Sequence, residues 1–310
     1  MSRSPRLVDA ADRQTDICVI SNTRYSLAVA PRVGAGIVWL RSVNRGDITW
    51  RWLREVPQED PISPSNIGCF LLAPFSNRIA FAKFNWMGQE RSLIDAPMMG
   101  PHAIHGVAWT ATWEVIEHST ETLELVLDRN EADWPWKFHA RVHYSLDEEG
   151  VRIRLSLRND SDTAMPSGLG FHPYFPVSDD VTLRADVAAM VTNSNLMLPE
   201  KLNANAPSVA ELRRGASLPR GLDNGFAHWS GTATICWPTA HKAMRIETRP
   251  RAQWAVLYTP VDSNYFCFEP VTHQTNAHNM TVSGISDSGL LSLQPGDEQE
   301  LTLIMRLAVQ

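Results

Sequence analysis

Glu269 and His172 are the side chains of this sequence best suited to exchanging protons. Glu269 closes the apolar, aromatic segment 266–269, where burial would raise its pKa from about 4.3 toward neutrality. The imidazole of His172, with an ordinary pKa of about 6.5, suits proton donation near neutral pH, and the glycine and proline around it restrict the backbone. Each residue also has a plainer interpretation, as a strand-end carboxylate in water for Glu269 and as a hydrogen-bonded core histidine for His172.

Arg78, directly after Asn77, is a candidate ligand-binding residue. A guanidinium group presents several N–H donors in a fixed fork that matches ligand oxygens, although an isolated arginine also suits an ordinary surface. His102 and His105 have a spacing that suggests a metal pair. In an extended segment, however, residues three apart point to opposite faces, so we do not expect these two to bind one ion together.

A zinc site assembled across the fold would have to draw on five side chains: His102, His105, His172, His273 and Glu269. No helical HExxH motif and no facial carboxylate pattern supports such a site. The sequence also lacks a GxSxG elbow, a Walker loop and a GxGxxG turn at a strand–helix junction. We therefore expect neither a metal ion nor an organic cofactor.

Composition excludes several other classes of protein. The chain has 310 residues, of which 44% are hydrophobic and 20% charged, as in ordinary globular proteins. Its net charge is -6 and its basic residues are scattered, so we expect no nucleic-acid partner. Residues 1–16 contain no long apolar run, which predicts neither a signal sequence nor a membrane segment and makes a cytoplasmic location the expectation.

The four cysteines also favour a reducing compartment. Cys18, Cys69, Cys236 and Cys267 lie far apart and form no CxxC pair. This spacing predicts neither a zinc ribbon nor a disulfide framework, and we expect free thiols.

The elements that must position these residues are strands. Apolar residues alternate with polar ones from Trp136 to Tyr144 and again from Val151 to Leu157, on either side of the turn 147–150. This period of two predicts a hairpin with one face on a core. Further short strands are expected at 18–20, 36–40, 109–116, 123–127, 232–237, 244–247, 254–258, 266–269 and 301–307. Only 208–214 has a helical pattern, so the prediction is an all-β sandwich or barrel forming a single domain over residues 1–310.

Five segments in this order resemble the aldose 1-epimerase (galactose mutarotase) family, in particular its shorter bacterial branch. They are Ser76-Asn77-Arg78-Ile79, His102-Ala103-Ile104-His105-Gly106, Gly170-Phe171-His172-Pro173-Tyr174-Phe175, Leu222-Asp223-Asn224 and Phe266-Cys267-Phe268-Glu269-Pro270-Val271-Thr272. The similarity extends from about Gly68 to the C-terminus. It implies a large, mostly antiparallel β-sandwich of the galactose mutarotase-like supersandwich type, with one open cleft.

The resemblance also implies roles for individual residues. The general acid of the family falls on His172 and its general base on Glu269, while the sugar-binding arginine falls on Arg78, beside Asn77. Histidine and aspartate ligands for sugar hydroxyl groups fall on His105 and Asp223.

Two segments depart from the family pattern. The His-Gly-Gly of many galactose mutarotases is His105-Gly106-Val107 here. The loop that carries a glutamine ligand is shortened to Val261-Asp262-Ser263-Asn264. Galactose is therefore not implied as the substrate.

The function implied is interconversion of the α and β anomers of a free aldose without metal or cofactor. Glu269 would take the proton of O1, and protonated His172 would serve the ring oxygen. One of Trp134, Trp136 and Trp254 could stack on the sugar. The expected partner is a small sugar, with no nucleic acid or membrane, and the chain would be a monomer or homodimer.

The sequence leaves two other functions open and disfavours a third. The first is a non-catalytic carbohydrate-binding or sensing protein of the same fold, although such a protein needs no matched acid and base. The second is an epimerase for a phosphorylated or sulfonated hexose, which would need an additional cation. The third, a sandwich serving lyase or hydrolase chemistry, would need a second domain.

Overall fold

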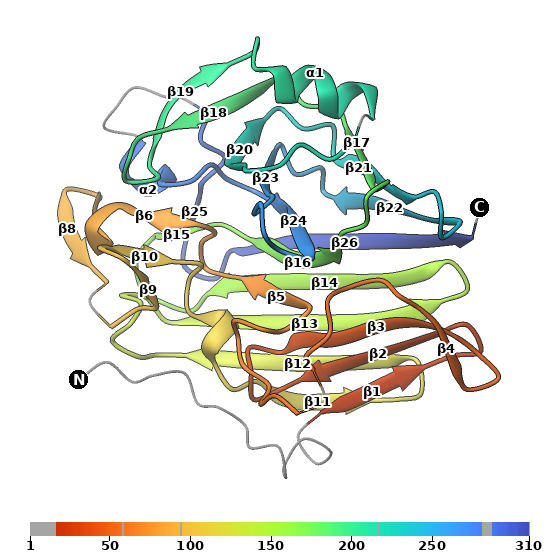
Figure 1. The fold of residues 1–310 in the computed structure, drawn as a ribbon. Helices are drawn as coiled ribbons and strands as arrows, with labels where there is room; N and C mark the ends of the chain where they lie inside the picture. The colour runs from red at the N-terminus through yellow and green to blue at the C-terminus, as the bar shows by residue number, and fades with distance from the viewer. Residues whose placement is uncertain (1–16, 58, 94, 216, 281–286, 310) are drawn as a thin grey trace.

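Two large β-sheets form the body of the molecule in the computed structural model, which describes residues 17–309 except 58, 94, 216 and 281–286 (Figure 1). The 11-stranded sheet has the order β1-β2-β3-β5-β16-β24-β23-β20-β18-β19, with β4 paired to β3. Its strands are β1 (Cys18–Ser21), β2 (Tyr25–Ala30), β3 (Gly36–Asn44), β4 (Asp47–Arg51), β5 (Cys69–Leu72), β16 (Gly170–Pro176), β18 (Ala189–Asn193), β19 (Pro199–Asn203), β20 (Asp223–Ala227), β23 (Trp254–Tyr258) and β24 (Tyr265–Val271).

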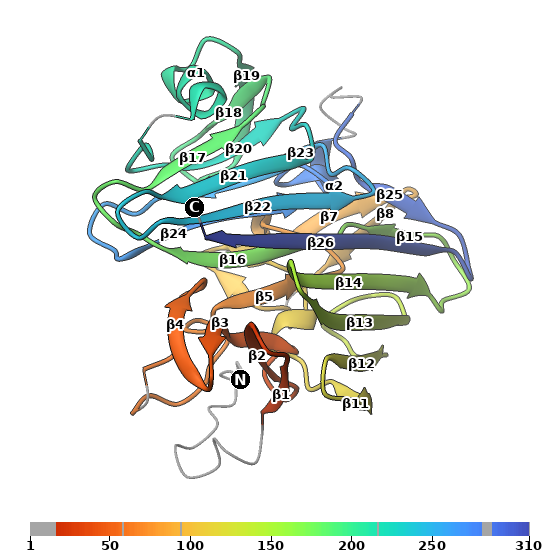
Figure 2. The same ribbon diagram turned by 90° about the vertical axis from the view of Figure 1, so that its right-hand side faces the viewer.

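The second sheet has eight strands in the order β11-β12-β13-β14-β26-β22-β21-β17, with β26 running through its middle (Figure 2). Its strands are β11 (Glu114–His118), β12 (Thr122–Arg129), β13 (Phe138–Asp147), β14 (Gly150–Asn159), β17 (Thr182–Ala185), β21 (Thr232–Trp237), β22 (Lys242–Arg249) and β26 (Glu298–Val309). The ladders that join these strands are antiparallel, which confirms the predicted mostly antiparallel all-β architecture.

Several smaller elements lie outside the two large sheets. They are the three-stranded sheet β6 (Arg78–Ile79), β10 (His102–Ile104) and β9 (Met98–Met99), the pairs β7 (Lys83–Trp86) with β8 (Gln89–Ser92) and β15 (Met165–Ser167) with β25 (Leu291–Leu293), the helices α1 (Pro207–Arg214) and α2 (Ala277–Met280), and the 3-10 turns η1 (Ala80–Ala82) and η2 (Ala108–Thr110). Helix α1 confirms the helical pattern seen at 208–214. No helix among the described residues is long and apolar enough to cross a membrane.

The predicted hairpin is present as β13 and β14, and it shows how the core forms. Phe138 pairs with Asn159 and Asp147 pairs with Gly150, so the turn lies at the expected position. Alternate side chains along β13, such as Val142 and Tyr144, are fully buried in the main core. Fully burying a side chain of this kind stabilises the fold by about 1.5 to 3 kcal/mol, and this holds the second sheet against the first.

The middle strands β16 and β24 of the 11-stranded sheet have two different faces. Phe171 and Phe175 of β16, and Phe266 and Phe268 of β24, belong to the main core between the sheets. The alternate residues, which include His172 and Tyr174 on β16 and Cys267 and Glu269 on β24, therefore project from the opposite face. That face carries a second apolar cluster that includes Phe70, Tyr174, Trp254, Val256 and Cys267.

One predicted strand was wrong in part. Residues 109–116 were expected to be extended, but Trp109 lies in the turn η2, and β11 begins only at Glu114. The backbone N–H groups of Val107 and Ala108 both donate to the carbonyl oxygen of Ala73, and this contact bends the chain before the strand begins. Such a contact between distant segments leaves no trace in the local pattern of apolar residues.

Candidate active site

The register of the sheet brings His172 and Glu269 together from distant parts of the chain. Gly170 pairs with Val271 and Tyr174 with Cys267, so His172 and Glu269 face one another across β16 and β24. On the other side His172 pairs with Phe70 of β5. Because paired residues project from the same face of a sheet, the imidazole and the carboxyl group lie side by side.

The two side chains form a close, buried pair. Nε2 of His172 lies 3.3 Å from Oε1 of Glu269, and the side chains are only 8% and 3% exposed. The remaining atoms, Nδ1 of His172 and Oε2 of Glu269, have no hydrogen-bond partner within the described part of the chain. Two groups that can exchange a proton therefore each keep a second polar atom free.

Burial shifts the pKa values of both groups toward their uncharged forms. It lowers the pKa of His172 well below its usual value, helped by the nearby His105 and Arg54. It raises the pKa of Glu269 well above its usual value, with Asp223 adding to the rise and Arg78 opposing it. The sequence led us to expect an ionised Glu269 and a protonated His172. In the free site the physical cost of burying charge instead favours a neutral imidazole and a protonated carboxyl group.

Asn77 and His105 hold a strained turn beside this pair. Both have positive φ angles, 56° and 61°, and Gly106 follows at 73°. The backbone N–H of Asn77 donates to Nδ1 of His105 at 3.2 Å, and the backbone N–H of His105 donates to the carbonyl oxygen of Asn77 at 3.0 Å. Since Nδ1 is an acceptor, a neutral His105 carries its proton on Nε2, where it can donate to a ligand. Burial, and then the charge of Arg78, lowers the pKa of His105 to about 3 and keeps the ring neutral.

Arg78 connects this turn to strand β20 of the 11-stranded sheet. Its Nη1 donates to Oδ1 of Asn77 at 3.1 Å, and its Nη2 lies 3.3 Å from Oδ2 of Asp223 on β20. The same Nη2 lies 3.6 Å from the sulfur atom of Met99, and the side chain is only 12% exposed. The sequence suggested a surface arginine as the alternative, and this burial does not agree with it. The structure thus brings all six predicted site residues into one connected group.

Two residues to which the sequence assigned no sugar-binding or catalytic role, His273 and Asn276, hold the turn in place. Nε2 of His273 accepts a hydrogen bond from the backbone N–H of Ser76 at 3.0 Å. The backbone N–H of Asn276 donates a hydrogen bond to the carbonyl oxygen of Arg78, and Oδ1 of Asn276 accepts a hydrogen bond from the backbone N–H of Ala80. Both follow β24 closely, so they tie the strand that carries Glu269 to the turn that carries Arg78. No sequence motif signals this, because the contacts go to backbone atoms far away in the chain.

Of the five side chains considered for zinc, His102 and His273 are engaged elsewhere. His102 accepts a hydrogen bond from the N–H of Phe81 and contacts the carbonyl oxygen of Leu196, and Nδ1 of His273 contacts that of Gln274. Within the described ranges, no group of three or more His, Cys, Asp or Glu side chains is arranged to hold a metal ion.

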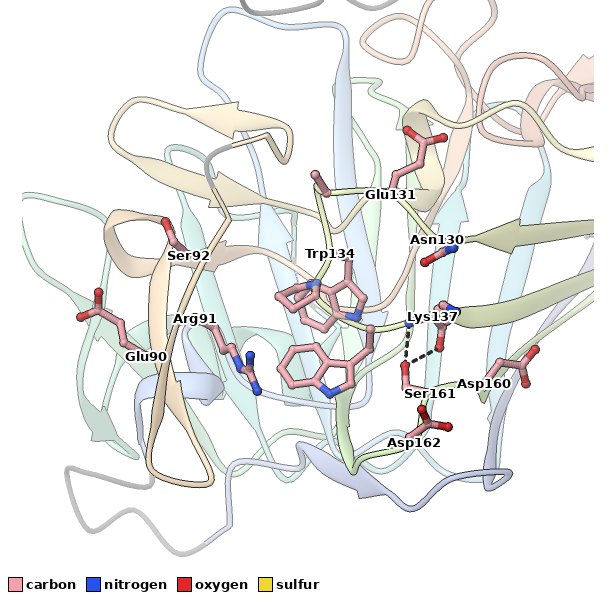
Figure 3. Close-up of a pocket in the computed structure, with 13 residues that line it drawn as sticks. Glu90, Arg91, Ser92, Asn130, Glu131, Trp134, Lys137, Asp160, Ser161 and Asp162 are labelled. Atoms are coloured by element: carbon pink, nitrogen blue, oxygen red, sulfur yellow. Dashed lines mark hydrogen bonds between the residues drawn. The ribbon is translucent and has the colours of Figure 1, made fainter.

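The three candidate tryptophans fall in two places. Trp254 pairs with Val271 and belongs to the apolar cluster on the same face as the His172–Glu269 pair. Trp134 and Trp136 instead line a separate cavity of about 550 Å³ (Figure 3). That cavity shares no lining residue with the site described above. Of the three, only Trp254 lies on the face of the sheet that carries the proton-exchanging pair.

Comparison with known proteins identifies the family. The family model of aldose 1-epimerase matches residues 16–306, so the chain belongs to the aldose 1-epimerase family. An uncharacterised curated relative, YphB of Escherichia coli K12, is 28% identical over 274 residues, covering 84% of this chain and 92% of that protein.

Solved structures agree with this assignment. A crystal structure of an aldose 1-epimerase candidate from Escherichia coli K12 superposes with a TM-score of 0.84 at 26% identity, over 95% of this chain and 99% of that one. A galactose mutarotase-like protein from Clostridium acetobutylicum gives 0.83 at 21% identity, over 94% and 95% of the two chains. Galactose 1-epimerase from Lactobacillus acidophilus gives 0.67 at 15% identity over 94% of both, and at such identities the likeness concerns the fold. The predicted galactose mutarotase-like fold is thereby confirmed.

Proposed function

We propose that this protein is an aldose 1-epimerase that interconverts the α and β anomers of a free aldose, with His172 and Glu269 as its proton-transfer pair. The observation that supports this most directly is the 3.3 Å approach of Nε2 of His172 to Oε1 of Glu269 on a buried face. Anomerisation needs one proton removed from O1 and one delivered to O5. Two adjacent titratable groups supply both steps, and no metal or organic cofactor takes part.

The proton count of the reaction balances on this pair. With the cyclic sugar bound, the proton that the free pair carries on Glu269 first passes to His172. The ionised Glu269 then takes the proton of O1 while His172 gives its proton to O5, the C1–O5 bond breaks, and C1 becomes an aldehyde carbon. Rotation about C1–C2 presents the other face of the carbonyl group, and ring closure returns both protons. While the ring is open, Glu269 is protonated and His172 is neutral. These are the uncharged forms that burial favours.

The residues around the pair suit the hydroxyl groups of a sugar. In this proposal Arg78 and His105 donate hydrogen bonds through Nη and Nε2, and Asp223 accepts them. Asn77 acts mainly on Arg78 and His105, because it contacts both. Since the positions of these groups are fixed by buried hydrogen bonds, little ordering is needed when the sugar binds.

The test is anomer exchange measured by saturation-transfer NMR. Freshly dissolved galactose, glucose, xylose, arabinose, fucose, a hexose 6-phosphate and a sulfonated hexose are compared, each with the wild-type protein and with Glu269→Gln. Glu124→Gln serves as the matched control, because Glu124 is also buried but pairs with Arg141 in the other sheet. We expect at least one sugar to exchange faster with the wild-type protein and with the control variant, and to lose this acceleration with Glu269→Gln.

The outcomes also separate the alternatives. Saturable binding of a sugar without accelerated exchange would contradict the proposal and favour a non-catalytic binding or sensing protein. Acceleration restricted to the phosphorylated or sulfonated hexose would keep the chemistry and change the substrate class.

A further inference from the structure

The imidazole of His172 lies inside a column of aromatic rings. Its ring centroid is 4.4 Å from that of Phe70 and 4.7 Å from that of Tyr174, with interplanar angles of 27° and 23°. A histidine that moves protons is commonly oriented by a hydrogen bond to its second ring nitrogen. Nδ1 of His172 has no such partner among the described residues, so the two stacked rings restrain the plane of the imidazole together with the contact of Nε2 with Glu269.

Arg54 closes this column on the side of Tyr174. Its guanidinium carbon lies 3.6 Å from the centroid of the Tyr174 ring, and its backbone N–H donates to the Tyr174 carbonyl oxygen at 2.8 Å. Nη2 of Arg54 donates to the carbonyl oxygens of Ser65 at 3.0 Å and Ile67 at 2.7 Å. Hydrogen bonds therefore fix the position of Arg54, and its guanidinium group packs on the ring of Tyr174 in a cation–π contact. Tyr174 in turn stacks on His172.

The same arrangement places a positive charge beside the proton-transfer pair. Arg54 contributes to the lowered pKa of His172, after burial and His105. The other titratable groups that affect the pair are Asp223 and Arg78, which act on Glu269. Within the described ranges no carboxylate forms an ion pair with Arg54, and the hydrogen-bond partners of its Nη2 are the neutral carbonyl oxygens of Ser65 and Ile67.

We propose that Tyr174 and Arg54 are positioning residues for His172: Tyr174 fixes the plane of the imidazole, and Arg54 acts through Tyr174. This inference rests on the proposed function for its kinetic consequences. Its structural content, the orientation and charge state of one imidazole ring, does not depend on any activity.

Four variants separate the ring from the charge. Tyr174→Phe keeps the stacked ring, and we expect its kcat to stay within about twofold of wild type. Tyr174→Leu removes the ring, and kcat should fall about tenfold or more while KM changes little, because misplacing a reacting group costs rate rather than binding. Arg54→Lys keeps the charge without the flat surface, so kcat falls but the pH profile stays. Arg54→Met removes both, so kcat falls and the acid limb of the profile moves to higher pH.

Arg24→Met is the control. Like Arg54, Arg24 donates to a backbone carbonyl oxygen and lies over a tyrosine ring, with its guanidinium carbon 6.0 Å from the centroid of Tyr25. It lies in the turn between the edge strand β1 and β2, away from the site. We expect this variant to behave as wild type. Thermal unfolding curves establish that both Tyr174 variants are folded. Equal kcat values for folded Tyr174→Leu and Tyr174→Phe would then overturn the inference.

A second measurement keeps the inference testable if no sugar is turned over. With ring-labelled histidine, NMR titration of His172 follows its pKa in wild type, Arg54→Met and Arg24→Met. A higher pKa in Arg54→Met alone supports the role of Arg54, and identical titration in all three contradicts it. The absence of exchange for every sugar would count against the proposed function and leave this titration unaffected.

Discussion

His172 and Glu269 lie opposite one another on β16 and β24, yet burial moves the pKa values of their side chains in opposite directions. The lowered pKa of the histidine and the raised pKa of the glutamate widen the pH range in which the pair holds a single proton. Because the two groups interact at 3.3 Å, the observed pKa values belong to the pair rather than to either residue.

This one-proton state predicts a bell-shaped pH profile of the exchange rate. On the acid side the rate falls as the pair gains a second proton, below the usual pKa of histidine because the value of His172 is lowered. On the alkaline side the rate falls as the last proton leaves, above the usual pKa of glutamate because the value of Glu269 is raised. Glu269→Gln and His172→Gln should each lower kcat by at least about a hundredfold, and the double variant much less than the product. Near wild-type exchange in Glu269→Gln would show that another base acts.

Arg78→Lys should lower the proposed epimerase activity although the charge is kept. Lysine cannot bond to Asn77 and Asp223 at once through a flat fork, so the loss in kcat/KM should correspond to about 1.5 to 3 kcal/mol. Arg158→Lys is the matched control, because Arg158 bonds to Asp160 through Nε and Nη2 on the exposed surface. Steady-state kinetics with the best sugar makes the comparison. Equal efficiency of the two variants would remove Arg78 from the binding site.

Stability should fall in acid because buried histidines stay neutral in the folded protein. The pKa is lowered to about 3 for His105 and about 4 for His273, in both cases mainly by burial. Below about pH 6.5 the unfolded chain binds protons that the folded chain does not, so stability declines with falling pH until the folded value is reached. As the pH falls from 6.5 to 5, each such histidine lowers the free energy of unfolding by about 2 kcal/mol. Urea unfolding of wild type and His105→Gln tests this, and His118→Gln, at an exposed site, is the control.

Gly106→Ala should be strongly destabilising. Gly106 has φ of +73°, and an added Cβ would lie 2.1 Å from the carbonyl oxygen of Ala73. Gly46 also has a positive φ, +92°, but nothing lies within 4 Å of the corresponding position. Alanine at Gly46 should cost about 1 to 2 kcal/mol, and at Gly106 more than about 3 kcal/mol. Thermal unfolding of the two variants isolates the contact, and similar losses would mean that the turn can move freely.

Chelation should leave activity unchanged. The proposed mechanism moves protons between His172, Glu269 and the sugar, with no step assigned to a metal ion. Dialysis against EDTA followed by the NMR exchange assay checks this, with added zinc as the comparison. Activity lost on chelation and restored by zinc would replace the acid/base mechanism with a metal-dependent one.

Much of the fold could be read from the sequence because strand alternation is a local property. The hairpin of β13 and β14 appears directly as apolar residues at every second position. The approach of His172 to Glu269 is different, because it depends on a register between strands from distant parts of the chain. Only the family resemblance predicted it.

Neither the charge state of the His172–Glu269 pair nor the residues that support it could be predicted from the sequence. Burial of Glu269 follows from packing of the whole sheet, and its local sequence is equally consistent with a solvated carboxylate. Arg54 lies in a loop with no motif, and its importance depends on Tyr174, which it contacts only in the folded protein.

The row formed by Phe70, His172, Glu269 and Val256 across four neighbouring strands also limits how a chain with this site can evolve. A strand offers only two faces, so one residue inserted between Cys267 and Glu269 would turn the carboxyl group into the hydrophobic core. The spacing inside the row therefore tolerates no gradual change. The segment 260–264 lies outside the paired strands, and its length can vary without moving either proton-transfer group.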